Sequence, residues 1–200
     1  MDEGVKSGDG RSARRAGDIV SAHAGLPLPV GQSLCSGGVC LQVPASEELG
    51  FIRRMWADAE TMEPVGGPVV LSPDEGVQWY RRWVDPGSAE RAYWLVTCER
   101  RPVGEVSLRC FDPVVGTGML NVKIASWERR RGYGRQAVRA VLRYFFEALG
   151  GTQMNDDIAL GNAAGQSLML SEGFTRDTTA ADVCRLYLTR RQWEVRQSVA

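Results

Sequence analysis

The chain has 200 residues, of which 44% are hydrophobic and 24% are charged, as in ordinary globular proteins. Its 24 basic and 24 acidic side chains cancel, and this balance argues against nucleic acid as the main partner. No apolar run reaches the roughly 18 residues that a membrane helix needs, so we expect no membrane association.

The single histidine, His23, lies in the N-terminal segment. A Ser-His or Cys-His nucleophile, or a His-rich zinc site, would need this residue to reach the core, so we expect no such device and no metal. The N-terminal segment also lacks the apolar stretch of a secretory signal, which favours a cytoplasmic protein.

Five cysteines form no small disulfide framework: Cys35, Cys40, Cys98, Cys110 and Cys184. Cys35 and Cys40 lie in a Gly/Ser-rich segment, where they could pair or bind a metal, but their spacing is not that of a CxxC site. We expect free thiols, as in a reducing cytosol.

Residues 1–38 are rich in Gly, Ser, Ala and Arg and show little apolar periodicity, so they predict a flexible tail. One domain, residues 39–200, follows. It opens with a short strand at residues 39–43 and a helix that Ser46 caps. A second helix begins at Ser72, which provides the N-cap, with Pro73 in the first turn and Glu75 at the capping-box position.

Three strands at residues 92–99, 103–111 and 119–126 then predict an antiparallel meander. A helix over 134–149 comes next, followed by a weak strand near 158–160, a short helix over 163–171, and strands near 174–176 and 183–189. The order predicts a mixed α/β sheet, mostly antiparallel and flanked by helices.

The most informative segment joins the third strand of the meander to the long helix. It reads Arg129, Arg130, Arg131, Gly132, Tyr133, Gly134, Arg135. A strand, a glycine turn and a helix N-terminus make an anion site, because glycines let a phosphate approach the backbone and the first-turn N–H groups are free to donate. Arginine adds donors suited to phosphate. The spacing fits neither a Walker P-loop nor a dinucleotide fingerprint.

A second segment lies downstream. Asn162 can cap the short helix, and Gly173 can end it before Phe174 begins a strand. The pattern Arg129-x-x-Gly132-x-Gly134, together with this Asn-to-Gly-Phe segment, resembles the GNAT superfamily of N-acetyltransferases. The resemblance covers about residues 43–193. The region between the early helices is similar to that of aminoglycoside 6′-type and ribosomal-protein N-terminal acetyltransferases.

The resemblance implies the GNAT acyl-CoA N-acyltransferase fold and acetyl-CoA as cosubstrate. The turn would hold the pyrophosphate, the edge of the preceding strand would pair with the pantetheine arm, and the strands would splay after Ile124. The implied cofactor-binding residues are Val122, Lys123, Ile124, Arg129, Arg131, Gly132, Tyr133, Gly134, Arg135 and Asn162. Sheet core is the alternative role of Val122 and Ile124, and simple helix capping that of Asn162.

Proton chemistry is less defined by the resemblance. Many GNAT members place a tyrosine four residues before the Gly of Gly-Phe, and here that position is Met169, which has no proton to give. Ser167 and Ser171 are nearby hydroxyls. The candidate base is Glu105, which interrupts an apolar strand and would act directly or through water; a solvent-facing strand residue is the alternative.

Carboxylates and aromatic residues between the early helices suit a cationic acceptor. They are Trp56, Asp58, Glu60, Glu63, Asp74, Glu75, Trp79, Tyr80 and Trp83. The resemblance therefore implies transfer of an acetyl group from acetyl-CoA to a primary amine of a small molecule or protein N-terminus, by direct attack. The alternative is a non-catalytic acyl-CoA-binding or regulatory module. A homodimer is common in the family.

Overall fold

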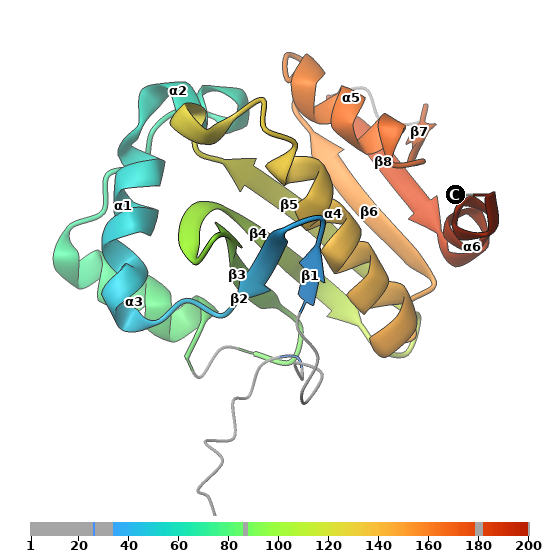
Figure 1. Cartoon of the computed structure of the whole chain (residues 1–200), viewed down its shortest axis with the longest axis horizontal. Helices are drawn as coiled ribbons and strands as arrows, with labels where there is room; N and C mark the ends of the chain where they lie inside the picture. The colour runs from blue at the N-terminus through green and yellow to red at the C-terminus, as the bar shows by residue number, and fades with distance from the viewer. Residues whose placement is uncertain (1–25, 27–33, 86–87, 179–181, 200) are drawn as a thin grey trace, which may run out of the picture.

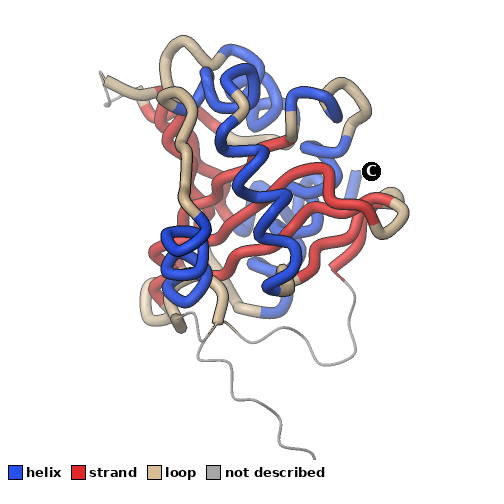
Figure 2. The backbone as a smooth tube through the Cα atoms, turned by 90° about the vertical axis from the view of Figure 1, so that its left-hand side faces the viewer, coloured by secondary structure: helices blue, strands red, loops and turns tan. Residues whose placement is uncertain are grey.

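The computed structural model describes residues 26, 34–85, 88–178 and 182–199. Eight strands form one sheet in the order β1-β2-β3-β4-β5-β6-β8-β7 (Figure 1). They are β1 Leu34–Ser36, β2 Val39–Gln42, β3 Ala92–Cys98, β4 Arg101–Asp112, β5 Thr117–Ile124, β6 Gln153–Ile158, β7 Thr175–Asp177 and β8 Cys184–Thr189. The sheet is one continuous twisted layer with helices packed against it (Figure 2).

The strand pairs are antiparallel except for β5 and β6, which run parallel. The mixed, mostly antiparallel sheet and the β3–β4–β5 meander are thus as predicted. β6 begins at Gln153, five residues before the strand expected near 158, because polar Asn155 and Asp157 on one face mask its buried alternation. α6, Arg190–Val199, was not predicted.

The sheet begins earlier than the expected boundary after residue 38. β1 pairs with β2 across a tight turn at Gly37 and Gly38, both of which have positive φ. Leu26 is 8% exposed and packs against the main core. The remaining residues of the expected tail, 1–25 and 27–33, lie outside the described part of the chain.

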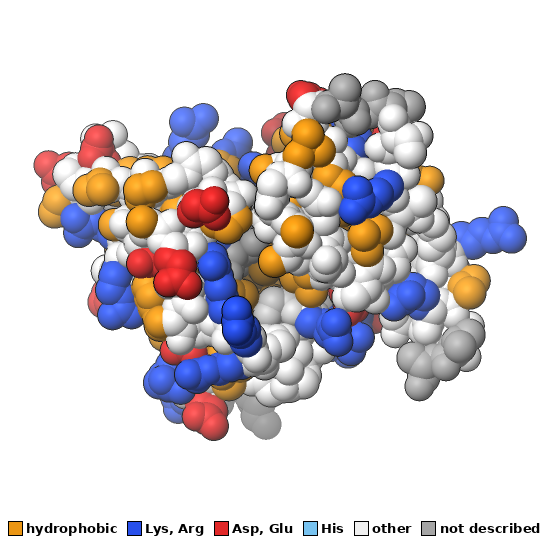
Figure 3. Space-filling view, turned by 90° about the horizontal axis from the view of Figure 1, so that it is seen from above, with side chains coloured by type: hydrophobic (Ala, Val, Ile, Leu, Met, Phe, Trp, Pro, Cys, Tyr) orange, Lys and Arg blue, Asp and Glu red, His pale blue; other side chains and the backbone are white. Residues whose placement is uncertain are grey.

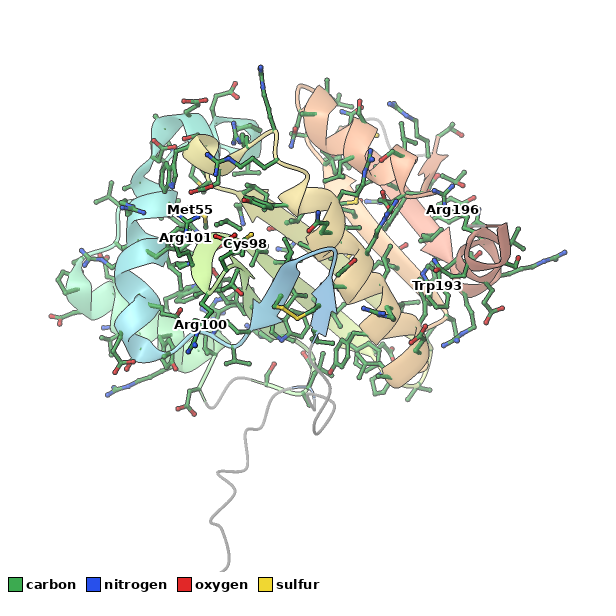
Figure 4. All side chains as sticks on the ribbon, viewed as in Figure 1. Met55, Cys98, Arg100, Arg101, Trp193 and Arg196 are labelled. Carbon is green, nitrogen blue, oxygen red and sulfur yellow. A yellow bond between two sulfur atoms is a disulfide. The ribbon has the colours of Figure 1, made fainter. Side chains whose placement is uncertain are left out.

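The β1–β2 hairpin also corrects the expectation of free thiols. Cys35 lies opposite Cys40 in the strand register, with their Cα atoms 4.1 Å apart, and the two form a disulfide (Figure 4). Sequence reasoning missed it because short hairpin strands cannot be recognised in a Gly/Ser-rich segment. Cys98, Cys110 and Cys184 are free thiols.

The early helices pack at one end of the sheet. A short 3-10 turn, Ser46–Glu48, leads into α1, Leu49–Ala57, and Asp58 then interrupts the helix and caps α2, Ala59–Met62. α3, Pro73–Trp83, has the predicted capping box: Glu75 N–H donates to Ser72 Oγ at 3.3 Å, and Ser72 N–H donates to Glu75 Oε2 at 2.8 Å. A smaller core of Ile52, Val84, Tyr93 and Leu95 lies beneath these helices.

The helices that follow β5 in the chain pack on the rest of the sheet. α4, Tyr133–Arg143, continues as a π-helical segment, Tyr144–Ala148, and packs its apolar stripe on the main core. α5, Ala163–Ser171, lies in front of β6 and β8 (Figure 1). Within the described ranges, no helix is both long and apolar enough to cross a membrane.

A cavity of about 230 Å³ lies between α4, α6 and the β1–β2 turn. Trp193 and Arg196 of α6 line it (Figure 4), and so do Arg139 and Glu172, which form an ion pair at 2.8 Å. None of its lining residues belongs to β5 or β6.

Candidate active site

The central feature of the site is a fork between β5 and β6. The two strands pair only from Thr117–Gln153 to Met119–Asn155, whereas β5 continues along β4 as far as Ile124. The strands therefore separate after Met119, not after Ile124 as expected. On the β6 side, the backbone edge of Leu120–Ile124 has no paired strand in the part of the chain that the structure describes, and such an edge can pair with an extended ligand. Val122, Lys123 and Ile124 lie on it.

The glycine turn stands beside this fork, at the N-terminal end of α4 (Figure 1). Gly132 has φ of 78° and Arg130 has φ of 64°, so the chain turns through left-handed conformations before the helix starts at Tyr133. Within the described part of the chain, the amide groups of residues 130–135 have no backbone acceptor outside the helix. The turn thus points free N–H donors and the positive helix end toward the same side.

Gly134 lies where the turn approaches the fork. A Cβ at this position would meet Leu168 Cδ2 at 3.4 Å and Ile124 Cγ1 at 3.5 Å, which are ordinary contacts. The protein itself therefore does not require glycine here. A close ligand at the helix end would require it, and this fits a pyrophosphate on the backbone amides.

Three of the four arginine side chains of the turn, those of Arg129, Arg131 and Arg135, have partners within the protein. Arg129 donates to Ile124 O at 3.3 Å and to Thr61 O at 3.0 Å. Arg131 pairs with Glu128 at 3.1 Å, and a hydrogen bond involving Tyr133 is the largest cause that raises its pKa. Arg135 pairs with Glu172 at 3.2 Å. The anion site suggested by the sequence therefore rests on backbone amides more than on guanidinium groups.

Arg129 belongs to a network that joins the early helices to the turn. Asp58 Oδ2 accepts from Thr61 N–H at 2.8 Å, Thr61 Oγ1 at 2.6 Å and Ser126 Oγ at 2.8 Å. Ser126 N–H donates to Thr61 Oγ1 at 2.8 Å. The hydroxyl of Thr61 and then that of Ser126 hold the pKa of Asp58 below its usual range. Asp58 therefore holds α2 against the residues that follow β5.

Glu105 lies on β4 opposite Lys123 of β5, and it is 2% exposed. Its Oε1 accepts from Lys123 Nζ at 2.6 Å, and its Oε2 accepts from Trp56 Nε1 at 2.7 Å and from the Tyr93 hydroxyl. Burial, and then the charge of Glu105, raises the pKa of Tyr93 well above its usual value. The sequence alternative of a solvent-facing Glu105 is thus wrong.

Aromatic rings surround this carboxylate. The ring centroids of Trp56 and Trp79 are 5.2 Å apart, and those of Trp79 and Tyr93 are 4.8 Å apart. Lys123 Nζ lies 5.9 Å from the centroid of Trp56 and also donates to Asn121 Oδ1 at 2.7 Å. We call Trp56, Trp79, Tyr93, Glu105 and Lys123 the aromatic–carboxylate cluster. The sequence analysis named Trp56, Trp79 and Glu105, and Lys123 as a cofactor-binding residue, but it did not name Tyr93 or the Lys123–Glu105 pair.

α5 brings the second motif to the fork. Asn162 Oδ1 accepts from Gly165 N–H at 2.9 Å, so Asn162 is the helix cap. Gly173 has φ of 97° and ends the helix, as expected. Met169 is 1% exposed in the main core. Seen from above, the molecular surface is indented between the side formed by α1 and α2 and the side formed by α5 (Figure 3).

A family model described as an acetyltransferase (GNAT) domain matches residues 39–175. The chain belongs to the GNAT acetyltransferase family. This membership confirms the fold and the reaction class expected from the two motifs, that of an acyl-CoA-dependent N-acetyltransferase. No curated protein matches the sequence closely enough to count as a relative.

Solved GNAT structures share the fold at low sequence identity. A spermidine N-acetyltransferase from Vibrio cholerae, in complex with CoA and spermine, has a TM-score of 0.71 and 18% identity, covering 78% of this chain and 98% of that one. A Vibrio cholerae protein provisionally assigned as a ribosomal-protein-serine acetyltransferase has a TM-score of 0.66 and 20% identity, covering 80% and 98%. A GNAT acetyltransferase from Bacillus anthracis has a TM-score of 0.66 and 13% identity, covering 80% and 99%.

Proposed function

We propose that this GNAT enzyme acetylates a primary amine of a small molecule or a protein N-terminus, with acetyl-CoA bound along the β5 edge and at the N-terminus of α4. The observation that carries the proposal is the fork. There, no strand among the described residues pairs with the β6-side edge from Leu120 to Ile124, and this edge lies beside a helix end with free amides. The edge suits a pantetheine arm and the helix end suits a pyrophosphate.

In this proposal the backbone of Val122, Lys123 and Ile124 holds the arm, and the amides of Arg131, Gly132, Tyr133, Gly134 and Arg135 hold the pyrophosphate. Arg129 supports the turn by its bonds to Ile124 O and Thr61 O. Asn162 contributes by capping α5 next to the fork. Acetyl-CoA supplies the activated acyl group, and the chain supplies orientation and proton transfer.

We place the acceptor amine beside the aromatic–carboxylate cluster. Aromatic faces attract a cationic amine before it loses its proton. Glu105 is the proposed base. A carboxylate has about four lone-pair positions, and the donors Lys123, Trp56 and Tyr93 leave one on Oε1 for a water that relays the proton of the amine. A Vibrio cholerae relative binds spermine, a polyamine; we extend only the amine class to this chain.

The test combines binding and turnover. Acetyl-CoA should raise the melting temperature, and a panel of primary amines that includes polyamines, aminoglycosides and N-terminal peptides should release CoA thiol, measured with a thiol reagent. Glu105→Gln should lower kcat by roughly 10²–10⁴-fold with little change in acetyl-CoA affinity. Binding without thiol release across the panel would instead indicate the non-catalytic module.

The proposal also includes a cytoplasmic location. It includes no nucleic-acid partner, and the zero net charge of the chain supports this second point. A homodimer stays a prediction that analytical ultracentrifugation would test.

A further inference from the structure

Asp156 is a carboxylate buried at an apolar position of β6. The alternation of the strand places its side chain on the same face as those of Met154 and Ile158, which are 0% and 7% exposed and belong to the main core. Asp156 itself is 4% exposed, and its register partner on β8, Leu186, is 0% exposed. Burying a carboxylate costs free energy that an apolar residue at this position would avoid. A functional role would explain why Asp156 is present here.

The position of Asp156 in the sheet indicates such a role. Asn155 is the last β6 residue that pairs with β5, so Asp156 is the first residue of β6 inside the fork. The charged groups that act on it come from three strands: Arg109 of β4, Lys123 of β5 and Asp157 of β6. The Nε of Arg109 is buried and has no hydrogen-bond partner among the described residues.

The burial of the Asp156 side chain favours its protonated form. Burial raises the pKa of Asp156 to about 7, and Asp157 adds to the effect, whereas Arg109 and Lys123 oppose it. A carboxyl with a pKa of about 7 is protonated in about half of the molecules at neutral pH and can release its proton without a large free-energy cost, as an efficient general acid must.

α5 lies over this part of the fork. Gln166 Nε2 donates to Ala159 O at 3.0 Å and to Leu160 O at 2.9 Å, so the helix is anchored over the end of β6. Met169, one turn further along α5, packs in the same core as Met154 and Ile158. Met169 cannot donate a proton, so a buried acid on β6 beneath the helix could serve in its place.

We propose that Asp156 is the general acid of the reaction, a role that rests on the proposed function. As the nitrogen–carbon bond forms and the carbon–sulfur bond breaks, the bonding electron pair goes to sulfur, and Asp156 gives its carboxyl proton to that sulfur. The amine nitrogen loses one proton as the amide forms. Asp156 is left as a carboxylate and regains a proton from solvent, which receives the proton of the amine.

The first test compares kcat of the wild type, Asp156→Asn and the control Asp157→Asn over pH 5.5–9. Asp157 is an exposed carboxylate one residue away, paired with Arg185 at 2.9 Å. Asp156→Asn should lower kcat by roughly 10²-fold or more, with acetyl-CoA affinity unchanged. Asp157→Asn should keep a maximal kcat near that of the wild type, with its pH-dependent component moved to lower pH because the charge of Asp157 raises the pKa of Asp156. The wild-type kcat should contain a component that falls as pH rises through about 7, and Asp156→Asn should lack it.

The second test does not depend on turnover. With ¹³C-labelled aspartate carboxyls, NMR of the wild type should show one aspartate titrating near neutral pH, and its signal should be missing from both Asp156→Asn and Asp156→Glu. Asp156→Glu keeps an acid and should retain more activity than Asp156→Asn. If Asp156→Asn fails to fold, this second variant and the wild-type titration still decide the matter.

Wild-type kcat in Asp156→Asn, or a carboxyl of Asp156 that titrates near pH 4, would overturn the assignment. The assignment would also be overturned if the wild-type kcat rose with pH through a component that Asp156→Asn lacks, because Asp156 would then act as a base. Absence of thiol release by the wild type with every amine would overturn the proposed function as well, and so the two failures are distinguishable.

Discussion

Lys123 Nζ lies 2.6 Å from Glu105 Oε1, so one of the two lysines in the sequence neutralises a carboxylate that is buried beneath Trp56. The two side chains come from adjacent strands and lie directly opposite each other in the β4–β5 register. The pair connects the β5 edge, where we place the cofactor arm, with the aromatic rings beside which we place the acceptor. A cationic side chain thus already occupies the cluster in which we expect an amine.

Replacing Lys123 should lower the unfolding free energy, because Lys123 is the counter-ion of the buried Glu105. Lys123→Met leaves the Glu105 carboxylate buried without its counter-ion, and breaking such a pair costs about 3 kcal/mol of unfolding free energy. The double variant Lys123→Met with Glu105→Gln should recover part of the loss, because the uncompensated charge is gone. Urea denaturation of the four proteins measures the coupling. Simple addition of the two single losses would contradict a direct interaction.

Gly134→Ala should separate cofactor binding from folding. The new Cβ makes only ordinary contacts with Leu168 and Ile124, at 3.4 and 3.5 Å, and replacing glycine within a helix stabilises by up to about 1 kcal/mol. The methyl group would nonetheless stand between the helix end and a bound pyrophosphate. We expect acetyl-CoA affinity to fall roughly tenfold or more, about 1.4 kcal/mol, by calorimetry.

Gly50→Ala is the matched control, since Gly50 lies in α1 and a Cβ there meets nothing within 4 Å. It should leave acetyl-CoA affinity unchanged. Equal affinity of the Gly134→Ala protein and the wild type would place the pyrophosphate elsewhere.

Asp58→Ala should affect the acceptor more than the donor. Asp58 accepts from Thr61 and Ser126 and thereby holds α2 against the residues after β5. Without it, the early helices lose their position relative to the fork, and misplacement of a substrate-positioning element lowers the rate. The acceptor KM should rise roughly tenfold, while acetyl-CoA affinity changes little. Glu147→Ala, which removes an exposed carboxylate of the π-helical segment after α4, is the control; a matching KM rise there would contradict the specific role of Asp58.

Asp156 should make stability depend on pH. Its folded-state pKa of about 7 lies above the value of about 3.9 in an unfolded chain. Between these values the native state binds a proton that the unfolded state has lost, so the unfolding free energy falls as pH rises from about 4 to about 7. The slope is about 1.4 kcal/mol per pH unit at most. Asp156→Asn should flatten it in denaturation at pH 5, 6, 7 and 8; parallel slopes would contradict the raised pKa.

The Cys35–Cys40 disulfide should stabilise the β1–β2 hairpin. A crosslink that closes so short a loop contributes about 2 kcal/mol in the chain-entropy description. A reductant should therefore lower the melting temperature of the wild type and leave the double variant Cys35→Ser with Cys40→Ser unchanged. An equal response of both proteins would assign the effect to another thiol.

Short-range features could be predicted from the sequence. The capping box of Ser72 and Glu75, the Asn162 cap and the left-handed turn at Gly132 each depend on residues within about one helical turn, and the structure contains all three. The two motifs and the order of the elements carried the resemblance to the GNAT fold, although the alternation of β6 was masked and neither β1 nor α6 was predicted.

Pairing between distant segments could not be predicted in this way. The fork opens after Met119, and Arg129 binds Thr61 O, because of how the strands and helices pack against one another. The sequence shows that Glu105 interrupts an apolar strand, whereas Asp156 lies before the strand expected near residue 158. Their surroundings differ because Lys123 faces one carboxylate across an intact ladder, whereas the other lies just beyond the point where the ladder ends.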